Sequence, residues 1–275
     1  MKLSDLENNI IQKKSYLCLG LDTDIEKIPK HLLKLENPVY QFNKSLIDRL
    51  NKKIIAVKIN TAFYEARGSN GWKDLENTIE YINSYYPELF TIADAKRADI
   101  GNTSNMYAKA FFEKMNFDSV TVSPYMGHDS VKEFLKYENK YVILLALTSN
   151  EGAVDFQLYN DNFLHILKES KKWNDSKKIM YVVGATKTEF FKKIRSIVPK
   201  SFLLIPGIGS QGGDFENTVK ASTSTSNNII INISRAILIC NVSCLPWLFG
   251  SKYIFYNKIT SCCCNIINVW NWSSS

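Results

Sequence analysis

Apolar runs of strand length alternate with amphipathic segments along most of this chain. The runs lie at 16–21, 54–59, 90–93, 119–122, 141–147, 179–184, 202–205 and 228–233. They are largely apolar, without a polar residue at every second position, which predicts strands buried on both faces. Between them, the helical spacing of apolar residues predicts helices at 38–50, 72–86, 103–115, 130–137, 156–173 and 187–197.

Strands that alternate with helices are typical of a parallel sheet, because each parallel connection needs a crossover segment. The chain has 275 residues, and a single barrel of this kind needs roughly 250. We therefore predict an α/β fold, a (β/α)8 TIM barrel, with residues 1–236 forming one catalytic domain. Periodicity alone leaves a doubly wound open sheet as the alternative.

The helix that should complete such a barrel is replaced by a Cys/Trp-rich tail at 237–275. This segment has no acidic residue, contains five of the six cysteines, and is interrupted by Pro246 and Gly250. Its cysteines lack metal-ligand spacing, whereas Cys18 is expected to be a small core residue. We interpret the tail as foreign to the fold, produced by a frameshift or intron read-through. A genuine extension and a membrane anchor are the alternatives.

The net charge of +7 changes this picture little. We interpret it as lysines on helix surfaces, and an anionic surface or an anionic small substrate is the alternative. No basic–aromatic run predicts a nucleic-acid partner. The first residues are polar and lack the apolar core of a signal peptide, so a cytoplasmic location is expected. The apolar stretch before Gly250 is too short and too broken to predict a membrane span.

Charged residues gather where the third predicted strand ends. Asp94 and Lys96 are two residues apart, so on a strand their side chains share a face, and Asp99 follows at the turn. With Lys58 on the neighbouring strand the signs alternate, and each charge would favour the ionised form of the next. The cluster predicts an ammonium acid at Lys96 and a carboxylate at Asp99. A surface salt-bridge cluster would show the same spacing.

A glycine-rich turn at 206–213 follows the seventh predicted strand and contains Gln211. Its backbone N–H groups could cradle a phosphate, and Arg235 after the eighth strand could bind the same dianion. Phosphate sites recur at this place in the barrel class. Pro206 and Ser234, at the same two strand ends, are expected substrate contacts as well.

Polar side chains also end the first, second and fifth predicted strands. Asp22 and Asn60 could form hydrogen bonds with sugar hydroxyls, and Thr148 and Ser149 could contact the edge of a heterocycle. Each of them could instead cap the helix or turn that follows.

Several motifs, in order along residues 1–236, resemble those of the orotidine 5′-monophosphate decarboxylase family. The most specific is the Asp-x-Lys-x-x-Asp-Ile core at 94–100, within DAKRADIGNTSNMYAKAFF. It is accompanied by GLDTD, VKINTAFYE, SPYMGHDS, LLALTSNEGAVDFQ, YVVGAT and PGIGSQGG. The LALTSN and PYMG segments are similar to the bacterial branch of the family.

The resemblance implies decarboxylation of orotidine 5′-monophosphate to UMP and CO2, the last step of UMP biosynthesis, without a metal or organic cofactor. It makes Lys58, Asp94, Lys96 and Asp99 the catalytic array, with Lys96 as the proton donor to C6. It also implies a homodimer in which Asp99, Ile100 and Thr103 act across the interface. The other implied contacts are Asp22, Lys58 and Asn60 to ribose, Thr148 and Ser149 to the pyrimidine, and Gln211 and Arg235 to the phosphate.

Two alternatives stay open. Related sugar-phosphate decarboxylases and synthases share Asp-x-Lys-x-x-Asp but use Mg2+, whereas the continuation at 100–103 and the LTSN segment favour the pyrimidine enzyme. The other alternative is a barrel made inactive by its altered C-terminus.

Overall fold

The computed structural model describes residues 1–208, 212–223 and 226–238. Within them, parallel strands close into a barrel in chain order from β1 to β8, and β8 pairs with β1. The strands are β1 Leu17–Gly20, β2 Ala56–Asn60, β3 Phe90–Arg97, β4 Ser119–Val122, β5 Tyr141–Leu147, β6 Ile179–Val183, β7 Leu203–Ile205 and β8 Ile229–Ile233. This closure confirms the predicted (β/α)8 barrel over the open sheet.

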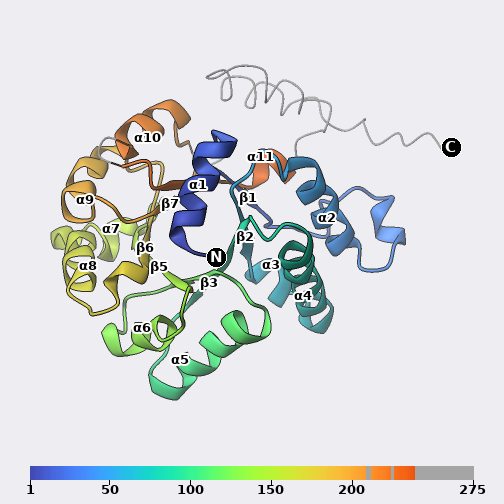
Figure 1. The fold of residues 1–275 in the computed structure, drawn as a ribbon, viewed down its shortest axis with the longest axis horizontal. Coiled ribbons are helices and arrows are strands. Elements are labelled where there is room, and N and C mark those ends of the chain that lie inside the picture. Colours follow the sequence, from blue (N-terminus) through green and yellow to red (C-terminus); the bar gives the residue numbers. More distant parts are fainter. Residues whose placement is uncertain (209–211, 224–225, 239–275) are drawn as a thin grey trace.

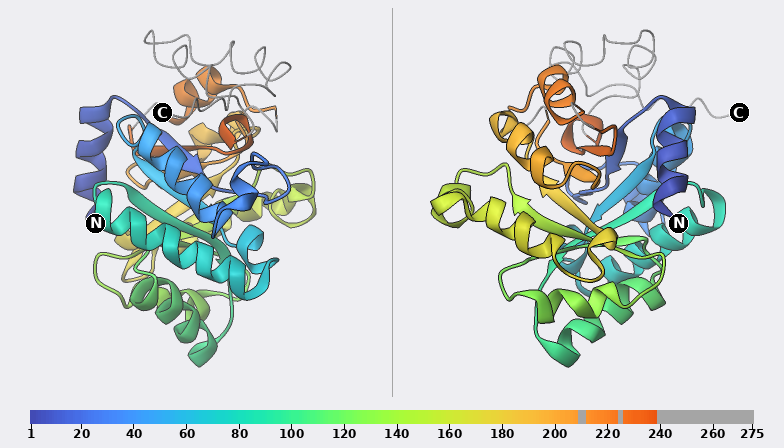
Figure 2. Two further views of the ribbon diagram at one scale, coloured as in Figure 1. Left: turned by 90° about the vertical axis from the view of Figure 1, so that its right-hand side faces the viewer. Right: turned by 60° about the vertical axis from the view of Figure 1, so that its left-hand side comes forward.

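Helices surround the barrel and connect its strands, as Figures 1 and 2 show from several sides. They are α1 Leu3–Lys13, α2 Pro38–Leu50, α3 Ala62–Glu65, α4 Gly68–Tyr85, α5 Gly101–Ala108, α6 His128–Leu135, α7 Ala153–Phe156, α8 Asn162–Lys171, α9 Phe191–Ile197, α10 Phe215–Ser222 and α11 Arg235–Leu238. A π-helical turn, η2 Lys109–Lys114, extends α5, and short 3-10 turns occur in the loops. In the part of the chain that the structure describes, no helix is both long and apolar enough to cross a bilayer.

The hydrophobic core has two layers. One lies between the strands and the surrounding helices. The other fills the barrel and includes Cys18, which is fully buried as predicted. Helix α1 covers the amino-terminal end of the barrel, where its Leu6 and Ile10 join this inner layer. One end of the barrel is therefore filled and capped, which leaves the carboxyl ends of the strands for a site.

Several predicted boundaries differ from the structure. The sequence predicts one helix at 156–173, but α7 and α8 are separate because Asn160 and Asp161 have left-handed φ angles of 48° and 54°. Strand β3 continues to Arg97, through the charged residues, where the apolar run predicts an end at 93. Helix α10 has no counterpart in the prediction. Of the tail expected at 237–275, the first two residues belong to α11, and 239–275 lie outside the described residues.

Arg195 on α9 is a buried cation, with 1% of its surface exposed. Its guanidinium donates to the carbonyl oxygens of Ser222 at 2.9 Å, Ser201 at 2.7 Å and Asn228 at 3.0 Å. Burial lowers the pKa of Arg195 to about 10. The side chain thus joins α9 and the end of α10 to the segments that lead into β7 and β8, far from the carboxyl ends of the strands.

We expect Arg195→Met to lower the free energy of unfolding by about 3 kcal/mol, because the buried Ser222 carbonyl and the partly buried Ser201 and Asn228 carbonyls each lose a donor. Urea unfolding would measure the change, with Lys192→Met on the exposed face of the same helix as the matched control. The purified variant should keep its catalytic constants at temperatures where it is folded. A loss below about 1 kcal/mol would contradict this role.

Candidate active site

A cavity of about 300 Å³ opens at the carboxyl ends of the strands. One side of its wall is apolar and consists of Leu145, Val182 and Leu204 from β5, β6 and β7. The rest is largely polar. Its other lining residues are Asp22, Lys58, Asn60, Asp94, Lys96, Thr148, Ser149, Asn150, Pro206, Gly207, Ile208, Asn232, Ser234 and Arg235. A ring with an apolar face and a polar edge would match such a wall.

A chain of ion pairs crosses this cavity. Lys58 Nζ lies 2.9 Å from Asp94 Oδ2 and 3.2 Å from Asp22 Oδ1, and Lys96 Nζ lies 2.6 Å from Asp94 Oδ1. The Lys58 and Asp94 side chains are 4% and 11% exposed, whereas Lys96 is 50% exposed. Lys96 is therefore the member of the chain that a ligand can reach most directly.

Both buried members of this chain are held in their charged forms. Burial alone would lower the pKa of Lys58, but the carboxylates of Asp94 and Asp22 outweigh it and raise that pKa above its ordinary value. Burial would likewise raise the pKa of Asp94, but Lys58 and Lys96 keep it well below its usual range. The cavity thus presents fixed charges across the neutral pH range.

Buried hydrogen bonds fix the loop that carries Asp22. Tyr64 OH donates to Leu21 O at 3.2 Å on one side, and Thr23 Oγ1 donates to Asn43 Oδ1 at 2.7 Å on the other. The Asn43 amide also donates to Tyr64 OH at 2.9 Å, which closes the network. Helices α2 and α3 therefore determine where the Asp22 carboxylate meets Lys58.

Asn60 and Thr148 take part in local hydrogen bonds as well as lining the cavity. Asn60 Oδ1 accepts a hydrogen bond from Ala62 N at 3.2 Å, at the start of α3. Thr148 N donates to Gln157 Oε1 at 2.6 Å, and Thr148 Oγ1 donates to Asn150 Oδ1 at 2.6 Å. The capping alternative considered from the sequence is thus observed at Asn60, in a side chain that also faces the cavity.

The backbone of Ser149 lies against Gly184, where an added Cβ would come within 2.6 Å of Ser149 Cα. Any larger residue at 184 would push the loop after β5 out of position. The strand that ends in YVVGAT therefore sets how far Ser149 reaches into the cavity.

The glycine-rich turn begins and ends close together. Gly213 N donates to Gly207 O at 3.1 Å, and Gly207 and Gly212 have left-handed φ angles of 100° and 86°. Pro206 lines the cavity at the base of this turn. Gln211 lies outside the described residues.

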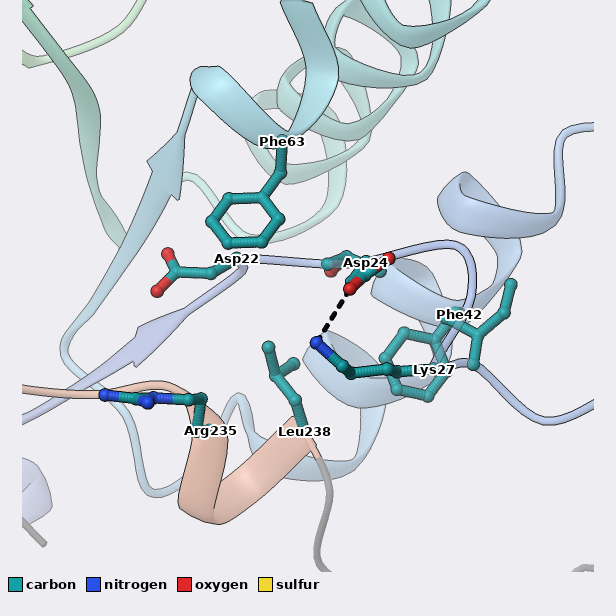
Figure 3. Close-up of a pocket in the computed structure, with 9 residues that line it drawn as sticks. Asp22, Asp24, Lys27, Phe42, Phe63, Arg235 and Leu238 are labelled. Atoms are coloured by element: carbon teal, nitrogen blue, oxygen red, sulfur yellow. Dashed lines mark ion pairs between the residues drawn. The ribbon is translucent and has the colours of Figure 1, made fainter. Parts of the chain in front are cut away.

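Arg235 begins α11 and lines two adjoining cavities. The second has a volume of about 360 Å³ and shares Asp22 and Arg235 with the first. Figure 3 shows it between α11, with Arg235 and Leu238, and the loop that carries Asp24 and Lys27. Its own ion pair, Lys27–Asp24 at 2.8 Å, is largely exposed on the lysine side. The ion pairs of Lys58 in the first cavity are buried, whereas that of Lys27 is not, which makes the first cavity the better candidate for chemistry.

Asp99, Ile100 and Thr103 do not line the cavity of their own chain. Asp99 Oδ1 accepts from Ile100 N at 2.7 Å, Ile100 is 55% exposed, and Thr103 is exposed on α5. The structure thus brings Lys58, Asp94 and Lys96 together but leaves the fourth predicted charge outside.

Asn232 on β8 is a cavity residue that the sequence analysis did not select. It is 7% exposed, and its Oδ1 has no hydrogen-bond partner within the described ranges. Gly20 makes room for it, since a Cβ there would lie 2.8 Å from that oxygen. A buried acceptor of this kind is satisfied by a ligand or water in the cavity. Among the residues that the structure describes, no group of His, Cys, Asp and Glu side chains could hold a metal ion.

The cavity with its ion pairs lies at the carboxyl ends of the barrel strands, where (β/α)8-barrel enzymes carry their active sites. The class of protein is therefore a (β/α)8-barrel enzyme. The comparison with protein families then gives the family. A model described as the Orotidine 5'-phosphate decarboxylase / HUMPS family matches residues 15–239, and the chain belongs to this family.

Curated relatives agree over most of the chain. An orotidine 5'-phosphate decarboxylase of Flavobacterium johnsoniae is 56% identical over 242 residues, covering 86% of this chain and 89% of that protein. One of Phocaeicola vulgatus is 54% identical over 243 residues, with the same coverage. Among solved structures, Leishmania donovani OMP decarboxylase is 29% identical, with a TM-score of 0.72, over 86% of this chain and 90% of that one. The Plasmodium berghei orotidine 5'-monophosphate decarboxylase is 27% identical, with a TM-score of 0.74, over 86% and 91%.

Proposed function

We propose that this chain is an enzyme that decarboxylates orotidine 5′-monophosphate to UMP and CO2, the last step of de novo UMP synthesis. The observation that carries the proposal is the Lys58–Asp94–Lys96 chain of ion pairs at the cavity, in a protein 56% identical to a relative named for this activity. The proposal includes the cytoplasmic location expected above. It needs no metal and no organic cofactor.

The chemistry follows from the position of Lys96. The bond between C6 and the carboxyl carbon breaks, CO2 leaves, and the electron pair stays on C6 in the plane of the ring. The Lys96 ammonium stabilises this pair and transfers a proton to it, and water later restores the proton to the neutral amine. Fixed charges do this work without reorganisation, because Lys58 and Asp94 are already ion-paired and buried.

The substrate phosphate is bound far from C6 in this proposal. Arg235 and the 206–213 turn, with Gln211, would bind the dianion. Pro206 and Ser234 line the same cavity as Arg235 and would contact the substrate there. Asp22 and Asn60 would bind the ribose hydroxyls, and Thr148 and Ser149 the pyrimidine edge. Binding energy from the phosphate would then hold the ring against Lys96.

We also propose that the active enzyme is a homodimer that completes each cavity with Asp99, Ile100 and Thr103 of the second copy. Exposed apolar side chains support this arrangement: Ile100 is 55% exposed, and Tyr125 in the β4–α6 loop is 89% exposed. The Asp99 backbone lies against the start of α6, which follows the β4–α6 loop, because Asp99 N donates to Ser130 Oγ at 3.2 Å. Exposed apolar side chains near a carboxylate that does not line its own cavity suit a second copy of the chain.

The loss of orotidylate's ultraviolet absorbance tests the proposed function with the purified full-length chain. We expect turnover that EDTA does not change. Turnover lost in EDTA and restored by Mg2+ would contradict the metal-free reaction proposed here.

Residues 237–275 are, in this proposal, not part of the catalytic unit formed by 1–236. The family model ends at residue 239, which supports this division. A soluble chain without turnover would implicate the tail. Grafting the C-terminal segment of the Flavobacterium johnsoniae relative after Arg235 would then separate a damaged enzyme from a wrong assignment.

We expect Arg235→Ala to raise KM and to lower kcat/KM by about 100-fold, since a guanidinium binds a phosphate dianion through charge-assisted hydrogen bonds. Steady-state kinetics and UMP binding would measure this loss. Binding of uridine, which has no phosphate, serves as the internal control and should not change. Equal losses for UMP and uridine would place Arg235 away from the phosphate.

A further inference from the structure

The backbone of Lys96 has a conformation that is unusual for a residue with a side chain. Its φ is +47°, in the left-handed region. The cause is an irregularity in strand pairing: β3 advances from Ala93 to Arg97 while β4 advances only from Val120 to Val122. The amide of Lys96 is thereby displaced from the regular ladder of backbone hydrogen bonds between the two strands.

The side chain of Thr121 supplies the missing acceptor. Lys96 N donates to Thr121 Oγ1 at 2.9 Å, and Thr121 Oγ1 donates to Asp94 Oδ1 at 3.0 Å. This carboxylate oxygen is the same one that lies 2.6 Å from Lys96 Nζ. Thr121 is 1% exposed, so water competes little for these hydrogen bonds.

We propose that Thr121 is a positioning residue for the proton donor, an inference that rests on the proposed function. One hydroxyl holds both ends of Lys96: its amide directly, and its ammonium through Asp94. The hydroxyl has a single hydrogen, which it gives to Asp94, so its lone pairs face the Lys96 amide. The strained backbone is thus kept in the one conformation that aims the ammonium into the cavity.

The other end of the barrel offers a matched control. Thr91 Oγ1 accepts from Asp118 N at 2.8 Å and donates to Asp118 Oδ2 at 2.9 Å. Thr91 is also 1% exposed, but it does not line the cavity. Its hydroxyl therefore joins an amide to a carboxylate, as that of Thr121 does, without a part in the proposed reaction.

The test compares Thr121→Val, Thr121→Ser and Thr91→Val by kcat, KM, UMP affinity and melting temperature. Thr121→Val should lower kcat about 10- to 100-fold, because an unsatisfied buried amide and a freed carboxylate misplace the ammonium. UMP affinity should change less than about 2-fold, since its phosphate and ribose contacts remain. Thr121→Ser, which keeps the hydroxyl, should stay within about 3-fold of the wild-type kcat. Thr91→Val should lose stability but keep kcat.

An unchanged kcat in Thr121→Val, or an equal loss in Thr91→Val, would overturn the positioning role. If Thr121→Val does not fold, Thr121→Cys takes its place, because a thiol is a poor hydrogen-bonding group of similar size. Wild-type turnover in the same assay separates the two proposals. If the wild type and its C-terminal graft both lack turnover, the proposed function and this inference fall together. An active wild type, or an active graft used as the parent of the variants, leaves Thr121 to be judged alone.

Discussion

Replacing Lys96 with alanine is expected to lower kcat by about 10⁴-fold or more, because it removes both the proton donor and the positive charge nearest the developing carbanion. The Lys96 side chain is half exposed into the cavity and is held by Asp94 at 2.6 Å. In the proposed mechanism, no other lysine takes over this role, since Lys58 is 4% exposed and already paired with Asp22 and Asp94.

The Lys96→Ala protein should still fold. Asp94 keeps its ion pair with Lys58 at 2.9 Å and its hydrogen bond from Thr121 at 3.0 Å, so no buried carboxylate is left unpaired. The absorbance assay, a melting curve and UMP binding would separate lost chemistry from lost structure. Lys44→Ala, which removes a lysine from a partly exposed ion pair with Asp48 on α2, is the control and should keep full activity. A near-native rate in Lys96→Ala would rule out the assigned role.

The barrel could be predicted because its strands are buried on both faces and therefore stand out as continuous apolar runs. The same continuity hides which side chains point inward. Leu145, Val182 and Leu204 form the apolar wall of the cavity, and Asn232 lies opposite Cys18 in the β1–β8 pair. Nothing in the runs of the three aliphatic residues distinguishes them from neighbours that face the helices. Asn232, by contrast, is a polar residue inside an apolar run, a signal that the sequence analysis did not use.

The charged part of the site could be predicted for a different reason. Lys58, Asp94 and Asp22 are polar residues at the ends of apolar runs, and a barrel brings all such ends together. The hydrogen bonds of Thr121 that orient Lys96 could not be predicted. They depend on a register shift between β3 and β4, and the alternation of side chains along a regular strand does not reveal such a shift. Arg195 was missed for a similar reason: its partners are main-chain carbonyls, which leave no pattern in the sequence.

The second large effect is expected at Asp99. This residue lies outside the cavity of its own chain, and in the proposed dimer it completes the cavity of the second copy. Asp99→Ala alone should lower kcat by about 10³-fold or more, since it removes the carboxylate that would press against the leaving carboxylate. The variant loses the hydrogen bond from the Ile100 amide to the Asp99 carboxylate, but its backbone N–H still donates to Ser130, so the loop itself should persist. A melting temperature and a UMP affinity equal to those of the wild type would establish that the variant is folded.

Mixing Lys96→Ala with Asp99→Ala should then restore activity that neither variant has. In a mixed dimer, one cavity carries both defects and the other carries none. Random exchange at equal amounts makes half of the dimers mixed, so about one quarter of the wild-type activity should return.

Mixing Lys96→Ala with Asp94→Ala is the control, because both residues line the cavity of their own chain and every mixed dimer would keep a defect in each site. Restoration in the first mixture alone would require Asp99 to act across the interface. If the subunits exchange but activity does not return, Asp99 either acts in the cavity of its own chain or takes no part in the reaction.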